Sequence, residues 1–480
     1  MRLSALIRRD LDPDPEITGV TADSRRVKPG YLFAALPGAT TDGRRFIADA
    51  LKAGAVAVIA GEPIPGFGAP VVRACDPRRA YALAAAAFWG AQPETCVAVT
   101  GTNGKTSVVT FCRQIFVACG RKGASMGTLG VQAGTEQLTP PALTSPDAGD
   151  VARLLAELAG LGVTHLALEA SSHGIDQRRL DGVRLKAAGF TNLSQDHLDY
   201  HGDMASYRAA KLRLFEALLP QGATAVLNAD SAEYPAFAAA ASGAGLTIAS
   251  VGENGEALRL VARDAVPNGQ RLTVEAAGSR FDIDLPLAGA FQASNALVAA
   301  GLCIAVGEDP ARVLAALEHL QGARGRMQRV GTGPKGGEAF VDYAHTPDGL
   351  KAALEALRPH ARGRLIVVFG AGGDRDRAKR PLMGAIAANI ADIVIVTDDN
   401  PRTEDPSAIR RAILAAAPGA LEAGGRREAI RMAVGMLSDG DLLVVAGKGH
   451  EQGQTFGDRV LPFDDATEVA AALGVEAAHG

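Results

Sequence analysis

The sequence has 480 residues, of which 47% are hydrophobic and 21% are charged, and its formal net charge is −4. This composition is typical of a globular protein, and the length predicts about three domains. No basic stripe is present, so nucleic acid is not a favoured partner. No uncharged apolar run approaches the roughly 18 residues that a membrane span needs, and the N-terminus lacks the apolar segment of a signal peptide. We therefore expect a cytoplasmic protein without a membrane span.

The five cysteines, Cys75, Cys96, Cys112, Cys119 and Cys303, are scattered along the chain. No two of them form a C-x-x-C pair, so the sequence favours neither a structural zinc site nor a disulfide framework. We expect all five to be buried thiols in a reducing compartment.

The first segment, residues 1–92, is predicted to combine helices with a strand. A helix is expected over 46–53, a strand over 56–59 and an alanine-rich helix over 79–89. Residues 90–93 read Gly-Ala-Gln-Pro, a combination that ends the last helix and favours a domain boundary.

The second segment opens with the most informative motif of the chain. Thr-Gly-Thr-Asn-Gly-Lys-Thr at 100–106 follows an apolar run and precedes an amphipathic stretch at 107–119. Strand, glycine loop and helix together hold nucleotide phosphates, because glycines let backbone N–H groups turn inward and the helix presents its positive end. Lys105 adds a charge, and the Thr106 hydroxyl can reach Mg²⁺. The usual pattern needs glycine where Val99 stands, so this loop is a variant.

More strands are predicted after this loop. They are expected over 164–168, 187–192 and 223–227, and the first is followed directly by Glu169. Residues 256–285 alternate in short apolar and polar runs, which predicts an antiparallel excursion inside the domain.

The third segment contains three strand candidates that are almost entirely aliphatic. They span 365–369, 393–396 and 442–445, and a polar or glycine-rich loop follows each one. Such strands are typical of a parallel sheet buried on both faces. Ligands bind beyond the carboxyl ends of strands in open α/β sheets, so the three loops predict a single binding site.

The first of these loops also invites a dinucleotide interpretation. Residues 370–373 read Gly-Ala-Gly-Gly. The full dinucleotide fingerprint needs glycine at 375, where Arg375 stands. The sequence therefore does not favour NAD as a ligand.

Four motifs, in their order along the chain, are similar to those of one known family. They are T-G-T-N-G-K-T at 100–106, L-E-A-S-S-H-G at 168–174, D-H-L-D-Y-H-G at 196–202 and D-Y-A-H-T-P at 342–347. Together they resemble the Mur ligases, the ATP-dependent amino-acid ligases that build the peptide of peptidoglycan. D-S-R at 23–25 and D-G-R-R-F at 42–46 resemble members that add the third residue. D-N-P-R at 399–402 resembles the signature of members that add meso-diaminopimelate.

The resemblance covers nearly the whole chain and implies an α/β fold of three domains. Residues 1–92 would bind the UDP-sugar, 93–323 would form a P-loop-like ATPase domain with a mostly parallel sheet, and 324–480 would form a Rossmann-like domain for the amino acid. The implied substrates are ATP, UDP-N-acetylmuramoyl-L-alanyl-D-glutamate and meso-diaminopimelate. ATP would phosphorylate a carboxylate of the UDP-dipeptide, and the amine of diaminopimelate would attack the acyl phosphate. We expect a monomer.

The resemblance also implies the nucleotide and metal residues. The ATP-binding positions are Gly101, Thr102, Asn103, Gly104, Lys105, Thr106, Ser107, Asn295, Arg326 and Asp342. Glu169 corresponds to the family's magnesium carboxylate, His197 to a second metal ligand of some relatives, and Thr106 is a further candidate ligand. Lys105, Glu169, His197 and Lys211 are the implied catalytic residues.

Lys211 has two competing interpretations. The pattern around it is that of an amphipathic helix, on which a lysine is normally exposed. By resemblance, however, it corresponds to a lysine that is carbamylated by CO₂ in the family. Carbamylation turns the cation into a carboxylate-like group that can bind Mg²⁺.

The resemblance implies ten contacts to the UDP-dipeptide: Ala22, Ser24, Ala39, Thr40, Thr41, Thr144, Ser145, Ser171, Gln177 and Arg179. Arg179 fits on chemical grounds, because the substrate carries a diphosphate and carboxylates. The diaminopimelate contacts would be Arg380, Asp399, Asn400, Pro401, Arg402, Gly447 and Glu451. Diaminopimelate differs from lysine by a second carboxylate, for which Arg402 supplies a fixed cation. Lysine would leave that arginine without a partner, a mismatch that can give roughly 10⁴–10⁵-fold discrimination.

Two other functions compete with this one. A ligase of the same fold with another acceptor, such as the lysine-adding enzyme or folylpolyglutamate synthase, is disfavoured by D-N-P-R at 399–402. A catalytically inactive nucleotide-binding or scaffold protein is disfavoured because Lys105, Thr106, Glu169 and Lys211 occur together.

Overall fold

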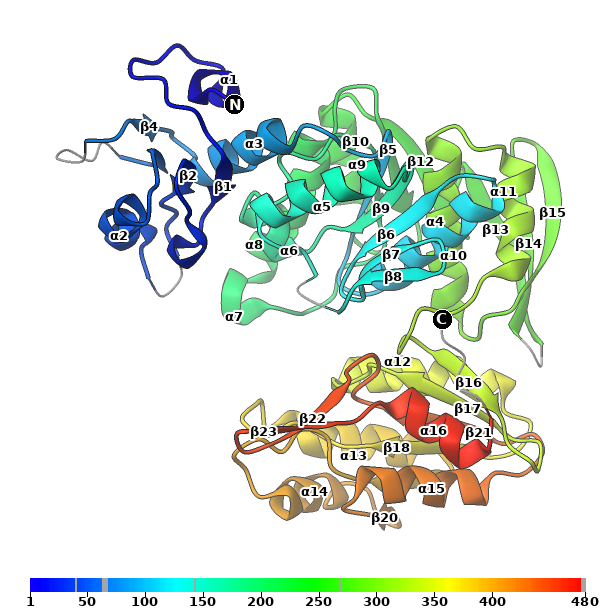
Figure 1. The fold of residues 1–480 in the computed structure, drawn as a ribbon. Helices are drawn as coiled ribbons and strands as arrows, with labels where there is room; N and C mark the ends of the chain where they lie inside the picture. Colours follow the sequence, from blue (N-terminus) through cyan, green and yellow to red (C-terminus); the bar gives the residue numbers. More distant parts are fainter. Residues whose placement is uncertain (39–40, 63–67, 142–143, 267–268, 476–480) are drawn as a thin grey trace. The chain divides into compact units, whose positions relative to one another are not determined.

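The computed structural model describes residues 1–38, 41–62, 68–141, 144–266 and 269–475 (Figure 1). The chain divides into two compact units. The first comprises residues 1–258 and 298–313, and the second comprises residues 259–297 and 314–480. Among the described helices, none has the length and apolar character needed to cross a membrane.

The first unit begins with a small parallel sheet. Its strands, in spatial order, are β1 (Gly19–Thr21), β2 (Tyr31–Ala34), β3 (Ala57–Ala60) and β4 (Val71–Arg73). Its helices are α1 (Leu3–Ile7), α2 (Ile47–Lys52) and α3 (Pro77–Trp89). Helix α3 starts where the Asp76 carboxylate accepts a hydrogen bond from the Arg79 N–H, and it ends at Gly90 with φ of 71°. The predicted strand at 56–59 and the predicted helices at 46–53 and 79–89 are confirmed.

A larger sheet follows in the same unit. Its neighbouring strands are β12 (Thr247–Gly252), β11 (Thr224–Asn228), β10 (Leu185–Phe190), β5 (Thr95–Thr100), β9 (His165–Glu169), β6 (Gly123–Gly127), β7 (Gly130–Ala133) and β8 (Glu136–Thr139). The strands from β12 to β6 pair in parallel, and β7 and β8 add antiparallel hairpins. The predicted strands of this segment are confirmed.

The helices around this sheet are α4 (Lys105–Ala118), α5 (Ala148–Gly160), α6 (Ser172–Asp176), α7 (Leu198–His201), α8 (Met204–Arg213) and α9 (Tyr234–Gly243). Central strand β5 is buried at every residue, and so is β9. The register pairs Val99 with Glu169 and Thr100 with Phe190. The loops that follow β5, β9 and β10 therefore leave the same edge of the sheet.

The second unit contains the antiparallel excursion predicted over 256–285. Its strands are β13 (Leu258–Val266), β14 (Gly269–Ala276) and β15 (Ser279–Leu285). Strands β14 and β15 pair antiparallel from Gln270 opposite Leu285 to Ala276 opposite Ser279. The helices α10 (Ala290–Ala305) and α11 (Pro310–Ala316) follow, and both contain residues of the two units.

A sheet of six strands forms the body of the second unit. In spatial order they are β16 (Gln328–Thr332), β17 (Glu338–Asp342), β21 (Leu442–Ala446), β18 (Leu365–Phe369), β19 (Ile393–Val396) and β20 (Leu421–Glu422). All adjacent pairs are parallel except β16 with β17. The helices are α12 (Pro347–Leu357), α13 (Lys379–Ile390), α14 (Pro406–Leu414), α15 (Arg426–Met436) and α16 (Asp465–Leu473), and β22 (Gly453–Phe456) and β23 (Arg459–Pro462) form a separate hairpin.

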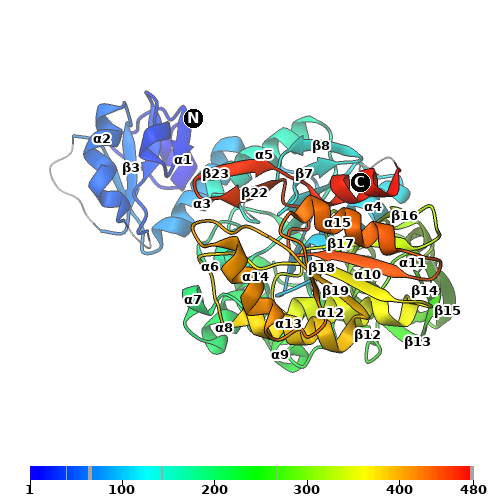
Figure 2. The ribbon, with the colours of Figure 1, turned by 90° about the horizontal axis from the view of Figure 1, so that it is seen from below.

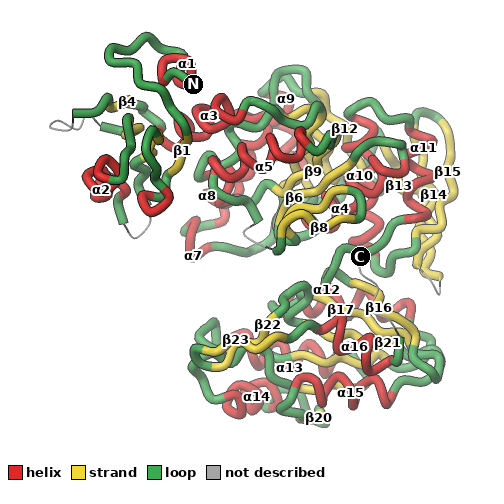
Figure 3. Tube along the Cα trace, in the orientation of Figure 1, coloured by secondary structure: helices red, strands yellow, loops and turns green. Residues whose placement is uncertain are grey.

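Alternate residues of these strands enter two different cores. Leu365, Val367 and Phe369 pack with α12, α13 and α14, whereas Ile366 and Val368 pack with α15 and α16. The sheet therefore lies between two layers of helices, and because both of its faces are covered, its strands carry few polar residues. Figure 2 shows the layers from below, and Figure 3 separates helices from strands by colour.

The described cysteines form no disulfide. Cys96, Cys112, Cys119 and Cys303 are buried as predicted, but Cys75 is exposed. The prediction of five buried thiols is therefore wrong for Cys75, which lies in the surface turn between β4 and α3 rather than inside an element.

A buried ion pair joins the first turns of α15 and α16. Arg426 donates to the Asp465 carboxylate through Nε at 2.7 Å and Nη2 at 2.6 Å, and both side chains are 0% exposed. Arg426 Nη2 also donates to the Ala446 carbonyl oxygen, at the end of β21. The pair thus ties both helices to the strand beneath them.

We expect Arg426→Met to destabilise the second unit by about 3–5 kcal/mol, because the substitution leaves Asp465 as a buried charge without its partner. Hydrogen exchange of the β21 amides measures this as faster exchange. Arg427→Gln is the matched control, since Arg427 pairs with Glu468 on the exposed side of the same helices. Equal protection of the β21 amides in the two variants would contradict the stabilising role of the Arg426–Asp465 ion pair.

Candidate active site

The phosphate loop is held in place by the residues that follow β10. Thr191 Oγ1 donates to the Asn103 carbonyl oxygen at 2.6 Å, and the Asn192 side chain accepts from the Asn103 N–H at 3.0 Å. Gly101 has φ of 151°, and a Cβ there would collide with the Thr191 side chain. Glycine is therefore required where the loop passes β10.

Helix α4 begins at Lys105, directly after Gly104, so its first N–H groups face the loop. The Lys105 ammonium donates to the carbonyl oxygens of Gly101 and Thr102, both at 2.8 Å. The side chain therefore lies across its own loop, where it can meet the charge of a phosphate. Thr106 and Ser107 are buried in the first turn of α4.

Glu169 ends strand β9 beside the phosphate loop and is only 2% exposed. Its carboxylate accepts from the Thr128 N–H at 2.9 Å and from the Thr128 hydroxyl at 3.2 Å. Thr128 directly follows β6 and was not identified from the sequence. A Cβ on Gly127 would lie 2.5 Å from the Glu169 Cδ, so the small residue makes room for the carboxylate.

Lys211 is buried, contrary to what the amphipathic pattern of its helix indicates. It projects from α8, is 1% exposed, and donates to the Gly101 carbonyl oxygen at 2.8 Å. Its amine lies 4.5 Å from the centre of the Tyr207 ring. Burial, reinforced by the charge of Lys105, lowers the pKa of Lys211 well below its usual value. This shift favours the uncharged amine, which is the form that reacts with CO₂.

His197, the other predicted metal ligand, directly precedes α7. It is exposed, has φ of 53°, and packs its ring edge against His173 at 4.9 Å between ring centres. In the described part of the chain, no three His, Cys, Asp or Glu side chains are arranged to hold a metal ion. Mg²⁺ commonly uses one or two carboxylates and keeps several waters, which Glu169 and Thr106 fit.

Three predicted ATP contacts lie in the second unit, linked by hydrogen bonds and by the backbone of residues 326–327. Asn295 donates to the Gln292 side chain, which in turn donates to the Arg326 carbonyl oxygen. Asp342 accepts from the Met327 N–H at 2.6 Å, and burial raises the pKa of its carboxyl group. The structure thus brings Asn295, Arg326 and Asp342 into one region.

The predicted UDP-dipeptide contacts on the larger sheet of the first unit form a cluster around the end of β9. Ser145 donates to the Glu169 carbonyl oxygen at 3.1 Å, and its hydroxyl lies 3.0 Å from that of Ser171. Arg179 donates to the Gln177 side chain and to the Ser145 carbonyl oxygen. Burial lowers the pKa of Arg179.

The remaining predicted contacts to this substrate are spread more widely. The Thr144 hydroxyl lies 2.9 Å from that of Thr128, which links it to the Glu169 carboxylate. Ala22 and Ser24 follow β1, and Thr41 is exposed. Ala39 and Thr40 lie outside the described residues.

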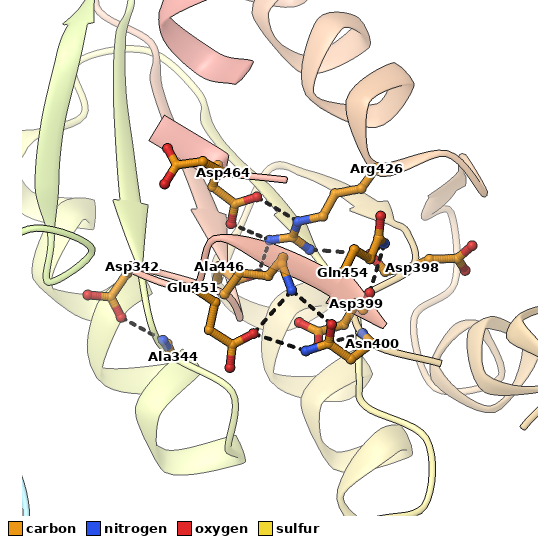
Figure 4. Close-up of polar contacts among 12 residues, drawn as sticks. Asp342, Ala344, Asp398, Asp399, Asn400, Arg426, Ala446, Glu451, Gln454 and Asp464 are labelled. Atoms are coloured by element: carbon orange, nitrogen blue, oxygen red, sulfur yellow. Dashed lines mark hydrogen bonds and ion pairs between the residues drawn. The ribbon is translucent and has the colours of Figure 1, made fainter. Parts of the chain in front are cut away.

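The three loops of the second unit that were expected to share a site do lie together. Strands β21, β18 and β19 are adjacent and parallel, so their carboxyl ends meet at one edge. The Arg402 side chain donates to the Gly373 carbonyl oxygen at 2.8 Å, and the Asn400 side chain donates to Glu451 at 3.0 Å. Gly447 has φ of 117° and lies against the Asp399 carboxylate. Figure 4 shows Asp399, Asn400 and Glu451 side by side.

The two predicted arginines of this site differ in their partners. Arg380 is 4% exposed, and both Nη atoms donate to Glu404, at 2.9 and 3.1 Å. Its Nε is buried without a hydrogen-bond partner in the structure. By contrast, no carboxylate in the described ranges forms an ion pair with Arg402. Of the two arginines, Arg402 is therefore the one whose charge is left for a ligand carboxylate.

Sequence reasoning missed Glu404, Lys448 and Thr128, which hold predicted site residues in place. Lys448 is 0% exposed and donates to both Asn400 and Glu451. Lys448 lies between two predicted contacts in the sequence Gly447-Lys448-Gly449-His450-Glu451, and this position could have indicated that it belongs to the site. Glu404 follows Arg402 by two residues, but nothing local indicates its pairing with Arg380.

Family models match almost the whole chain. The "Mur ligase family, catalytic domain" matches residues 16–89, the "Mur ligase middle domain" matches 99–303, and the "Mur ligase, glutamate ligase domain" matches 325–449. These matches and the fold define a three-domain α/β ligase.

Similar proteins give the same result. A Caulobacter vibrioides protein named UDP-N-acetylmuramoyl-L-alanyl-D-glutamate--2,6-diaminopimelate ligase is 68% identical, with 99% of each chain covered. A protein of the same name from Mesorhizobium japonicum is 55% identical, covering 97% of this chain and 96% of the relative. A solved structure of that name superposes with a TM-score of 0.76 at 33% identity, with 99% of each chain covered. The chain belongs to the Mur ligase family.

We expect Gly127→Ala to reduce ATP-dependent turnover on the order of 100-fold, because the added methyl group displaces the Glu169 carboxylate by about 1 Å. ADP formation measures the loss. Gly160→Ala is the matched control, since a Cβ there meets no atom within 4 Å. Full activity of the Gly127 variant would show that the position of Glu169 is not critical.

Proposed function

We propose that this chain catalyses the ATP-dependent addition of meso-diaminopimelate to UDP-N-acetylmuramoyl-L-alanyl-D-glutamate, a step of peptidoglycan precursor synthesis. The observation that carries the proposal is the arrangement of side chains in the loop 399–402. It presents Arg402 free of any described carboxylate partner, beside Asn400 and the Glu451 carboxylate. The named relatives at 55–68% identity support the same reaction.

The ATP side of the reaction uses the first unit. The backbone from Gly101 to Ser107 and the Lys105 ammonium bind the phosphates. Bound Mg²⁺ would neutralise charge on the triphosphate and on the phosphoryl group in transfer. Glu169 and Thr106 would hold it with oxygen atoms. Asn295, Arg326 and Asp342, which belong to the second unit, are the other proposed contacts to ATP.

Lys211 acts in this proposal as a carbamate. The neutral amine forms an N–C bond with CO₂ and releases one proton, which gives an anionic group with two oxygens. Its burial beside Lys105 favours this modification, since an unmodified ammonium there would add to the positive charge. The carbamate oxygens and His197 are the further candidates for metal binding.

The UDP-dipeptide is bound by Ser145, Ser171, Gln177, Arg179 and Thr144, together with the residues after β1. Arg179 meets anionic groups of this substrate, because its guanidinium is fixed by Gln177 and the Ser145 carbonyl oxygen. A carboxylate of the UDP-dipeptide is then phosphorylated, the amine of diaminopimelate attacks the acyl phosphate, and phosphate leaves. The enzyme is proposed to act as a cytoplasmic monomer.

The choice of amino acid rests on the two charged groups at the far end of diaminopimelate. Arg402 pairs with the carboxylate of diaminopimelate that lysine lacks, and Asp399, Asn400 and Glu451 surround the ammonium group beside it. Bound lysine would leave the Arg402 guanidinium desolvated without a partner, which is costly. Arg380, held by Glu404, shapes the wall of the same site.

The proposal predicts that ADP forms rapidly only when both the UDP-dipeptide and diaminopimelate are present. Replacing diaminopimelate with L-lysine should lower kcat/KM roughly 10⁴-fold, because Arg402 then has no carboxylate partner. Coupled ADP release with product detection by mass spectrometry measures both rates. Equal rates with the two amino acids would refute the specificity, and ATP hydrolysis without product would refute ligation.

Carbamylation of Lys211 is tested by ¹³C NMR of protein equilibrated with ¹³C-bicarbonate. A carbamate signal is expected at neutral pH and should be lost in Lys211→Ala, together with activity. Lys186→Ala is the control, because the Lys186 side chain is 46% exposed and ordinarily solvated. A signal that persists in Lys211→Ala would place the modification elsewhere.

A further inference from the structure

Lys448 is a fully buried lysine with two side-chain partners, both of them predicted acceptor contacts. Its Nζ donates to Asn400 Oδ1 at 3.0 Å and to Glu451 Oε2 at 3.1 Å. A lysine is almost never fully buried unless it is paired. Lys448 meets this condition through two residues that are themselves predicted to contact the incoming amino acid. The proposed function assigns no role to Lys448.

The three side chains close a ring of hydrogen bonds. Asn400 Nδ2 donates to the same Glu451 Oε2 at 3.0 Å, so that one oxygen accepts from both partners. Within the described residues, no group donates to Glu451 Oε1. Since the Glu451 side chain is 35% exposed, Oε1 remains available to a ligand. Figure 4 shows Asn400 and Glu451 facing each other.

Asn400 has a second anchor that does not involve Lys448. Its Oδ1 also accepts from the Thr455 N–H at 3.0 Å. Two donors therefore face the amide oxygen and one acceptor faces the amide nitrogen, which fixes the orientation of the group. Without Lys448, Asn400 keeps Thr455, whereas Glu451 loses its only cationic partner among the described residues.

The other nearby cation is not available to Glu451. The Arg426 guanidinium is taken up by the Asp465 carboxylate and by the Ala446 carbonyl oxygen. Asp399 adds a further negative charge to this region. Lys448 is thus the group that balances and orients the Glu451 carboxylate.

We propose that Lys448 is a positioning residue of the acceptor site: it holds Glu451 by Oε2 so that Oε1 faces the ammonium group of the incoming amino acid. This inference rests on the proposed function and adds to it. Lys448 touches no substrate in this arrangement. Its effect reaches the acceptor through Glu451 and leaves the nucleotide and the UDP-dipeptide unaffected.

The test is a double-mutant cycle of Lys448→Met and Glu451→Gln, with KM measured separately for diaminopimelate, ATP and the UDP-dipeptide. For Lys448→Met, we expect KM for diaminopimelate to rise roughly 10- to 100-fold, the size expected for one hydrogen bond to a charged group. The two other KM values should stay within about twofold. The double variant should be little worse than Glu451→Gln, since both changes remove the same interaction.

Two outcomes would overturn the inference: an unchanged KM for diaminopimelate in Lys448→Met, or a fully additive double variant. A rise in all three KM values would also overturn it, because it indicates a merely structural lysine. If Lys448→Met does not fold, Lys448→Gln takes its place in the same cycle. If the wild-type enzyme does not ligate diaminopimelate, the proposed function itself is refuted. The wild-type rate alone distinguishes this result from a failure of the inference about Lys448. Arg427→Gln, on an exposed face of the same unit, is the control variant.

Discussion

The parallel pairing of adjacent strands is the constraint on which both sites depend. In the first unit, Val99 lies opposite Glu169 and Thr100 opposite Phe190, so the phosphate loop, Glu169 and Thr191 begin at one level. In the second unit, Phe369 lies opposite Val396 and Val368 opposite Val445. The polar loops therefore emerge together, and a shift of one residue would turn the strand side chains to the other face.

The Gly101 carbonyl oxygen links this geometry to the electrostatics of the first unit. Lys105 and Lys211 both donate to it at 2.8 Å, although they come from different helices. Two ammonium groups this close repel each other, and burial of Lys211 adds the cost of desolvation. The lowered pKa of Lys211 follows from both causes, with burial the larger. A phosphate beside Lys105 and a carbamate on Lys211 would each place negative charge beside these two amines.

Sequence patterns predicted the local structure well and the pairings between distant residues poorly. The aliphatic strands, the glycine loop and the convergence of the three loops after 369, 396 and 446 follow from short-range rules. The burial of Lys211 does not, because its helix carries an amphipathic pattern and the lysine is covered where α8 packs against the phosphate loop. Lys448 is likewise 48 residues from its partner Asn400. Such pairs depend on register and packing that no local pattern encodes.

The loops after β18 and β19 also show why two neighbouring arginines are not equivalent. Glu404 holds Arg380 with two hydrogen bonds, and this contact lowers the pKa of Glu404 to about 2, so the pair stays ionised at any pH near neutrality. The charge of Arg380 is thus neutralised before a ligand arrives. Arg402 has only the Gly373 carbonyl oxygen as a side-chain partner in the described structure. Of these two arginines, Arg402 is therefore the one whose charge is left for a ligand carboxylate, while the Arg380–Glu404 pair ties α13 to the loop after β19.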